Sequence, residues 1–420
     1  MNQPRPVVIV GGMRTPFVKS FTKYKATNQE MQTEVLSQLA KKFNLKQVDE
    51  VVLGTITKSG TDWNLARESV LGSSLSNSTP AFDIQRACGT GLEAAIAIAN
   101  KIALGQIECG IAGGSDTNTK VSLEFTRKAS DKFIGLSRAK NFGQMLGGIS
   151  QFRPSDFKPK IPGITEPRTG KSMGDHCELM AKEWGISREE QDQLAYQSHQ
   201  NGAKAYEEGF YKDSLFSYSG ADKDSVLRPQ TTIEKLSQLR PAFDRAAGTL
   251  TAGNSSAMTD GASAVFLASE DYAKKNGLPI LCYLKDAQAS AVDFVAGSGL
   301  LMAPTIAVGK MLKRNALSLQ DFDFYEVHEA FAAQVLCTLK AWEDEKYCKE
   351  VIGLDKALGS IDRNKLNVKG SSLALGHPFA ATGGRIISTL GDILNQNKGR
   401  GLISICTGGG MGVAAILESN

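Results

Sequence analysis

The chain lacks most features of secreted, membrane-spanning and nucleic-acid-binding proteins. Its seven cysteines form no CxxC pair, and their odd number argues against a disulfide framework, so a reducing, cytoplasmic location is expected. No apolar run is long enough to cross a bilayer, and no secretory leader is expected before the first apolar segment, residues 7–10. The net charge of +4 is too small to predict nucleic-acid binding.

The composition is that of an ordinary globular protein, with 41% hydrophobic and 22% charged residues. A chain of 420 residues is too long for one core, so two or three compact units are expected. Strands separated by helices predict an α/β fold with a covered parallel sheet in the first 120 residues. Strands are expected at 7–10, 50–53 and 109–112, and helices at 28–43, 63–71 and 91–104.

The strand-helix alternation stops at about Lys120 and returns after Arg240. Polar residues dominate this region, and helical periodicity is confined to 177–184 and 188–208. Ser187 and Glu190 fit a capping box, which marks the start of the second of these helices. We therefore interpret the region as an insertion folded over the sheet domain.

The end of the chain repeats the order of elements near its beginning. Sheet-like character returns at 248–268, and the last segments read as a helix at 383–394, a strand at 401–405 and a glycine turn at 408–410. The front has a helix at 91–104, a strand at 109–112 and a glycine pair at 113–114 that also reads as a turn. This pattern predicts an internal duplication whose two halves bring both helix starts to one seam.

Cys88 stands at the junction between a strand-like approach and a predicted helix. A helix N-terminus offers free N–H groups and the positive end of the helix dipole, so this position should lower the thiol pKa and supply a nucleophile. Gly89 and Gly91 should leave room for a substrate near the sulfur. The alternative is an inert buried cysteine that fills space.

Three other segments place reactive side chains in glycine-flanked loops. His328 separates a strand from a helix, His377 precedes Pro378 in a loop before a helix, and Cys406 ends a strand that runs into a glycine turn. Each could be an ordinary core or loop residue when taken singly. The other two of the four histidines, His176 and His199, read as a helix-start residue and a surface residue.

Two thiols and two imidazoles suit the making or breaking of a carbon–carbon bond beside a thioester. One cysteine, deprotonated by a base, can form an acyl-enzyme, and the second can move a proton on and off carbon. Backbone N–H groups in a glycine turn and a histidine can hold a developing oxyanion. A peptidase needs only one thiol and would leave Cys406 without a task.

These residues resemble the thiolase family, specifically the 3-ketoacyl-CoA thiolase (acetyl-CoA acyltransferase) group, over nearly the whole chain. The supporting stretches are Arg14-Thr15-Pro16-Phe17, Gly113-Gly114, Leu239–Asp244, Gly248–Ser256, Asp260-Gly261-Ala262, Gly376-His377-Pro378 and Cys406–Gly410.

The resemblance implies catalytic roles for five positions. Cys88 would be the acylated nucleophile, with His377 as its activating base. Cys406 would be the acid/base that protonates the leaving carbanion in thiolysis or deprotonates acetyl-CoA in synthesis. His328 and His377 would polarise one thioester oxygen, and the N–H groups of Cys88 and Gly408 would form a second oxyanion hole.

The resemblance also implies that coenzyme A and acetyl-CoA are substrates, with no metal and no covalently bound cofactor. Ser256, Arg228 and Met173 would contact CoA, and Phe331 and Ala330 would line the neighbouring wall. The implied fold is a duplicated, five-layered α-β-α-β-α architecture with an inserted loop domain. The expected units are an N-terminal half (1–120 and 248–270), a CoA-binding loop domain (121–247) and a C-terminal half (271–420), assembled as a homodimer or homotetramer.

Two departures from the common thiolase pattern indicate a subgroup. Many thiolases carry Asn where this chain has His328, and the His-Glu-Ala-Phe form resembles the β-subunit of the fatty-acid-oxidation trifunctional complex. The segment Lys369-Gly370-Ser371-Ser372 is less glycine-rich than usual. The subgroup would act on medium or long 3-ketoacyl-CoAs in β-oxidation, with a possible hydratase/dehydrogenase partner subunit.

Residues 124–160 combine basic and apolar side chains. The segment is either a solvated lid or a surface for a partner or an anionic membrane. Its apolar residues are Phe125, Phe133, Ile134, Leu136, Phe142, Met145 and Leu146, and its basic residues are Arg127, Lys128, Lys132, Arg138, Lys140, Arg153, Lys158 and Lys160.

Three other functions remain open at this point. One is an acetyl-CoA acetyltransferase, which would make acetoacetyl-CoA. A condensing enzyme of the ketoacyl-synthase type shares one Cys and two His but has no use for a second active thiol. The third is a non-catalytic module that binds acyl-CoA or lipid. The sequence leaves the preferred acyl chain length and the physiological direction undetermined.

Overall fold

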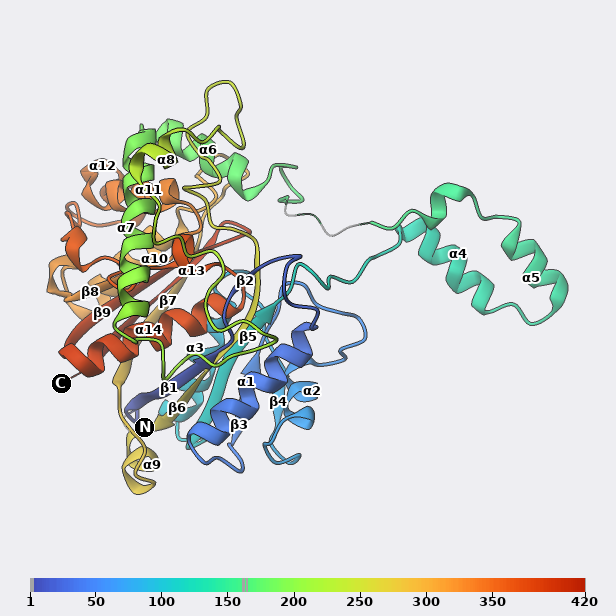
Figure 1. The fold of residues 1–420 in the computed structure, drawn as a ribbon, viewed down its shortest axis with the longest axis horizontal. Coiled ribbons are helices and arrows are strands. Elements are labelled where there is room, and N and C mark those ends of the chain that lie inside the picture. The colour runs from blue at the N-terminus through green and yellow to red at the C-terminus, as the bar shows by residue number, and fades with distance from the viewer. Residues whose placement is uncertain (1–3, 161–162, 164, 420) are drawn as a thin grey trace.

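The computed structural model describes residues 4–160, 163 and 165–419 (Figure 1). Within these ranges, none of the helices has the length and apolar character needed to span a membrane. The described strands form one ten-stranded sheet whose N-terminal part has the order β4-β3-β5-β6-β1, with β2 attached to β6. These strands are β1 (Val7–Arg14), β2 (Val18–Lys19), β3 (Glu50–Leu53), β4 (Ala81–Asp83), β5 (Cys109–Asp116) and β6 (Thr259–Ser269).

The C-terminal part of the sheet repeats this arrangement. Its order is β7-β10-β9-β8, and only two residue pairs, Val8 with Tyr283 and Ile9 with Cys282, join β1 to β7. In both parts a parallel pair (β3 and β5, β8 and β9) is followed by antiparallel partners (β6 and β1, β10 and β7). These strands are β7 (Cys282–Ala291), β8 (Phe324–Val327), β9 (Gly399–Thr407) and β10 (Met411–Ser419).

The parallel pairing expected in the first 120 residues is present where β3 pairs with β4 and β5, but the sheet as a whole is mixed, because β1 and β5 both pair antiparallel with β6. A parallel neighbour needs a crossover, whereas β9 and β10 are joined by the tight turn 408–410 and must run antiparallel. In the N-terminal part, β6 follows β5 only after the long inserted region and returns beside it in the opposite direction. The segment 248–258, expected to be sheet-like, is irregular, and the strand begins at Thr259.

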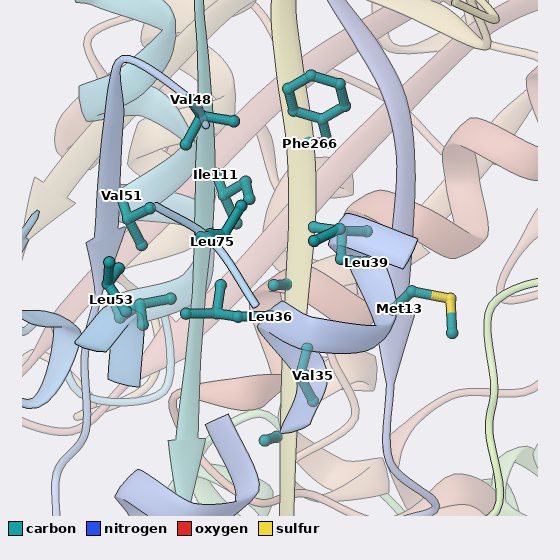
Figure 2. Packing of buried hydrophobic residues seen from close by; sticks show 14 of the residues in the cluster. Met13, Val35, Leu36, Leu39, Val48, Val51, Leu53, Leu75, Ile111 and Phe266 are labelled. Atoms are coloured by element: carbon teal, nitrogen blue, oxygen red, sulfur yellow. The ribbon is translucent and has the colours of Figure 1, made fainter. Parts of the chain in front are cut away.

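Helices lie outside and between the two parts of the sheet. Figure 2 shows one outer core, in which Val35, Leu36 and Leu39 of α1 pack against Val51 and Ile111. A central core joins α3 and α14 to strands of both parts, and another outer core packs α10 and α11 on the C-terminal strands. The helices are α1 (Asn28–Lys42), α2 (Leu65–Gly72), α3 (Thr90–Ala103), α9 (Glu270–Lys275), α10 (Ala303–Asn315), α11 (Ala332–Glu343), α12 (Glu345–Tyr347), α13 (Ser372–Leu375) and α14 (Ala381–Asn397).

Close contact between α3 and α14 explains the glycines near Cys88. A Cβ on Gly91 would lie 2.7 Å from the Ala380 carbonyl oxygen, and one on Gly383 would lie 2.2 Å from the Leu92 nitrogen. The prediction that Gly91 makes room for substrate is wrong, because it makes room for the other helix. The pair 113–114 lies inside β5 and is not a turn; a Cβ on Gly114 would also meet Ala380.

The inserted region is mostly helical and sends one arm away from the body (Figure 1). The arm, residues 124–160, carries α4 (Arg127–Ser137), α5 (Phe142–Ile149) and a short 3-10 turn (Pro154–Phe157). The predicted capping box of Ser187 and Glu190 is present at the start of α7. The other helices of the region are α6 (Met173–Glu183), α7 (Arg188–Glu207) and α8 (Ile233–Ser237).

Candidate active site

Cys88 is half-buried in a tight turn between β4 and α3. The preceding residue, Ala87, has a positive φ of 43°, a conformation that an L-residue adopts only under constraint. Thr90 holds the turn, since its hydroxyl accepts a 2.9 Å hydrogen bond from the Arg86 N–H and donates a 2.6 Å one to the Ala87 carbonyl. The backbone at Cys88 is therefore held in a constrained turn between the strand and the helix.

The glycine turn between β9 and β10 lies directly opposite this thiol. The backbone N–H groups of Gly408 and of Cys88 itself lie close enough to the sulfur to lower the pKa of the thiol. Cys406, one residue before the end of β9, is buried, and after burial the charge of the Cys88 thiolate is the next cause that raises its pKa. The structure therefore brings together the two cysteines and the glycine that the sequence analysis selected.

Both thiols are protonated in the resting protein. Burial raises the pKa of Cys88 to about 12, and the N–H groups of Gly408 and Cys88 offset only part of that effect. Burial also raises the pKa of Cys406 well above its ordinary value. The expectation that the helix start lowers the Cys88 pKa is wrong, because desolvation of the thiolate outweighs the donors. Cys88 therefore needs a base.

The two histidines of the glycine-flanked loops face each other, with ring centroids 4.2 Å apart. His377 is buried; its backbone N–H donates to the Thr259 hydroxyl at 2.8 Å, and its Nδ1 lies 2.6 Å from Thr382 Oγ1. Burial and the nearby Arg385 charge lower the pKa of His377 to about 3. Its imidazole is neutral at physiological pH and is therefore able to accept a proton.

His328 follows β8 and is fully buried. Its Nδ1 lies 2.9 Å from Ser372 Oγ, while its Nε2 has no hydrogen-bond partner among the described residues. Burial, followed by the charges of His377 and Arg385, lowers its pKa well below the ordinary value. The neutral ring thus presents one unpaired nitrogen at the site.

Contacts between the starts of α3 and α14 connect the thiol pair to the histidine pair. Gly91 meets Ala380 within van der Waals distance, and the Ala380 N–H donates a 2.9 Å hydrogen bond to Asp116 Oδ2. The charge of Asp116 in turn raises the pKa of Cys88. His377 therefore enters from a loop next to the Cys88 turn, as expected for two helix starts at one seam.

A cleft of about 750 Å³ opens between the inserted region and the strand-like segment 255–258. Ser256 and Arg228, two of the residues expected to contact CoA, line it, and so do the cationic residues Lys19 and Lys235. Met258, which also lines the cleft, pairs its backbone with that of His377. The cleft therefore has one wall residue beside the backbone of His377, and its positive charge suits phosphate groups.

The other three residues proposed to contact CoA lie behind or beside the cleft. Ala330 accepts a 3.0 Å hydrogen bond from the Ser256 N–H, and Phe331 pairs with Ser255, so both support the wall from behind. The sulfur of Met173 lies 3.7 Å from the position that a Cβ on Gly408 would take. Met173 is therefore near the glycine turn at the thiols.

Two residues near the site, His199 and Glu166, differ from what the sequence pattern predicts. His199 is buried, not on the surface: it lines the cleft, its Nδ1 accepts a 3.2 Å hydrogen bond from the Arg228 N–H, and burial lowers its pKa to about 4. Glu166 accepts a 2.6 Å hydrogen bond from the Gly409 N–H and so holds the glycine turn. No local pattern marks Glu166, which lies in an irregular segment rich in Pro and Lys.

His176 lies at the start of α6, as expected, with its Nε2 2.7 Å from Thr169 Oγ1.

The chain matches one protein family over most of its length. The thiolase N-terminal domain matches residues 7–271, and the thiolase C-terminal domain matches residues 278–419. Similar curated proteins are a 3-ketoacyl-CoA thiolase of Shewanella loihica, 38% identical over 98% of this chain and 96% of the relative, and one of Yersinia pestis, 38% identical over 100% of both.

Solved structures also match the chain over almost its whole length. A Bacillus anthracis acetyl-CoA acetyltransferase has a TM-score of 0.82 at 29% identity, with 100% of both chains covered. Human mitochondrial 3-ketoacyl-CoA thiolase in complex with CoA has a TM-score of 0.81 at 29% identity, with 99% of this chain and 98% of that chain covered. These matches confirm the predicted fold class.

Proposed function

The chain belongs to the thiolase family, and we propose that it is a 3-ketoacyl-CoA thiolase, an acetyl-CoA C-acyltransferase of fatty-acid β-oxidation. The observation that carries the proposal is that the packing of α3 against α14 joins a pair of protonated thiols, Cys88 and Cys406, to a pair of neutral imidazoles. A single-thiol enzyme has no use for the second buried cysteine.

Thiolysis would begin with attack of Cys88 Sγ on the 3-keto carbon of the substrate. His377 takes the thiol proton, and the N–H groups of Cys88 and Gly408 hold the alkoxide that forms. The bond between C2 and C3 then breaks, leaving an acyl-enzyme on Cys88 and an enolate of acetyl-CoA. Cys406 protonates C2 of this enolate, whose thioester oxygen is held by His328 and His377.

The second half of the cycle releases the shortened acyl-CoA. The thiol of an incoming CoA gives its proton to the Cys406 thiolate and attacks the acyl carbonyl. The tetrahedral intermediate again places its oxygen at the N–H groups of Cys88 and Gly408, and its collapse frees the Cys88 sulfur, which regains its proton from His377. All groups return to their starting protonation states.

The cleft would hold the CoA arm and nucleotide. Positive charge for the phosphates would come from Arg228, Lys19 and Lys235. Ser256 lines the same cleft and would contact the chain of CoA that leads to the thioester. Residues 121–247, which supply most of one wall, would form a CoA-binding domain between an N-terminal half (1–120 and 248–270) and a C-terminal half (271–420). Met173, Ala330 and Phe331 would shape the inner end near the thioester. We propose a homodimer or homotetramer.

We propose the degradative enzyme in preference to an acetyl-CoA acetyltransferase. The full-length curated relatives at 38–39% identity are named 3-ketoacyl-CoA thiolases, whereas the acetyl-CoA acetyltransferase structure is 29% identical. His328 in place of the common Asn, a form that resembles the trifunctional β-subunit group, also supports this choice and suggests medium or long substrates.

Thiolysis rates on acetoacetyl-CoA and on a long 3-ketoacyl-CoA, measured side by side, test this choice. We expect kcat/KM to be roughly tenfold or more higher for the long substrate, because a longer acyl chain buries more apolar surface in the transition state. Activity confined to acetoacetyl-CoA would instead indicate the acetyltransferase.

The arm would bind an anionic membrane surface. Helix α5 has no buried residue, and Phe142, Met145, Leu146 and Ile149 are all exposed. Eight Lys and Arg against three acidic residues in 124–160 favour anionic lipid over a neutral surface. A hydratase/dehydrogenase partner subunit is the alternative occupant.

Co-sedimentation with vesicles tests the arm without disturbing the active site. The full chain should sediment with phosphatidylglycerol-rich vesicles but not with pure phosphatidylcholine, and the double variant Phe142→Ser, Leu146→Ser should stay in solution. Acetoacetyl-CoA turnover should be the same in both proteins, because α5 lies on the arm, away from α3 and β9, which border the thiols (Figure 1). Equal sedimentation of variant and wild type would contradict the membrane proposal.

A further inference from the structure

Arg385 lies buried in α14 and makes no short ion pair with a described carboxylate. The nearest acidic side chain, Glu326, is 3.9 Å away. Instead, the guanidinium donates to two serine hydroxyls: Nη2 to Ser372 Oγ at 2.8 Å and Nη1 to Ser371 Oγ at 3.2 Å. These serines belong to the segment 369–372 that departs from the family's glycine-rich pattern, and both are fully buried.

The Ser372 hydroxyl lies between Arg385 and His328. Its oxygen is 2.8 Å from Arg385 Nη2 and 2.9 Å from His328 Nδ1. A guanidinium has donors only, so Ser372 must accept from Arg385. The hydroxyl proton then needs an acceptor of its own, and in the described part of the chain His328 Nδ1 is the one within hydrogen-bond distance.

This geometry decides which ring nitrogen of His328 carries the proton. If Nδ1 were protonated, it would donate to Ser372 and leave the buried hydroxyl proton without an acceptor. If Nδ1 is unprotonated, Arg385 Nη2 donates to Ser372 Oγ and the Ser372 hydroxyl donates to His328 Nδ1, and the cation strengthens the hydroxyl as a donor. The proton of the neutral ring therefore resides on Nε2.

His328 Nε2 is itself buried and lacks a partner within the described residues. An unpaired buried N–H is costly unless a ligand arrives to accept from it. The His377 ring, with its centroid 4.2 Å from that of His328, places the free N–H beside the proposed reaction centre.

We infer that Arg385 and Ser372 are positioning residues that lock His328 in the Nε2-protonated tautomer, so that this N–H is oriented to hold the thioester oxygen of the enolate. The identity of the acceptor rests on the proposed thiolase function, whereas the tautomer does not. The low pKa that burial gives His328 agrees with a neutral donor at this position.

The tautomer can be measured directly in the resting enzyme. In protein labelled with ¹⁵N-histidine, the His328 ring, assigned by its disappearance in His328→Asn, should show a protonated Nε2 and an unprotonated Nδ1. In Ser372→Ala this pattern should be lost or become a mixture of tautomers. A proton on Nδ1 in the unmodified enzyme would overturn the inference, whether or not the protein proves to be a thiolase.

Ser371→Ala is the matched kinetic control, because it removes the same kind of Arg385 contact without touching His328. Ser372→Ala should lower kcat for thiolysis roughly tenfold with little change in KM, whereas Ser371→Ala should cost much less. In a His328→Asn background, the ratio between the two serine variants should fall to about one. Equal losses in both serine variants, or a ratio that persists without His328, would show that Ser372 acts only as a structural residue.

Discussion

Replacing Cys88 with alanine should lower acyl transfer by about 10⁴-fold or more while CoA still binds. The reason is that no other described side chain at the site combines a thiol with the two N–H groups of Cys88 and Gly408. Turnover of a 3-ketoacyl-CoA, with calorimetric binding of CoA to the same preparation, measures both quantities. Equal loss of turnover and CoA binding would indicate a folding defect instead.

Arg228→Ala provides the reciprocal control. It should weaken CoA binding by roughly tenfold, because a cationic residue leaves the cleft, while iodoacetamide still labels Cys88. Since burial raises the pKa of Cys88 to about 12, the labelling rate should keep rising with pH past the ordinary thiol value of 9.0. A Cys88 that acetyl-CoA fails to protect from labelling, or that never reacts, would favour the non-catalytic binding module.

Cys406→Ser should lower thiolysis by about 10³-fold, the second largest effect expected. A serine hydroxyl in this buried position is far too weak an acid to protonate the leaving carbanion at a useful rate, although its size is nearly that of cysteine. Steady-state thiolysis at saturating CoA measures the loss. The first chemical step is expected to be affected less, because Cys88 and His377 remain.

The same variant separates a thiolase from a condensing enzyme of the ketoacyl-synthase type. A synthase with one Cys and two His would be indifferent to Cys406→Ser. Cys337→Ser is the matched control, since Cys337 is also buried but lies in α11 and is not among the groups that affect Cys88. Equal losses in both variants would indicate that the core, and not the proton transfer, had been damaged.

The sequence by itself was sufficient to predict local features such as loops, helix starts and the order of elements. Glycines on both sides of His377 and after Cys406 predicted loops next to these two side chains. The capping box at Ser187 predicted the start of a helix. The order of elements also predicted the duplication, because the same helix-strand succession occurs at both ends of the chain. These signals lie within a few residues of each other, where sequence and conformation are directly linked.

Only the tertiary structure decided how burial changes the site. The sequence suggested an activated Cys88 at a helix start, but desolvation by both halves of the molecule raises the pKa and makes the base necessary. Likewise, Glu166 reaches the glycine turn from 243 residues away, and Arg385 reaches His328 through Ser372. Side chains brought together by the packing of distant segments leave no local pattern, so the sequence indicated the candidate reactive groups, whereas the fold determined their protonation.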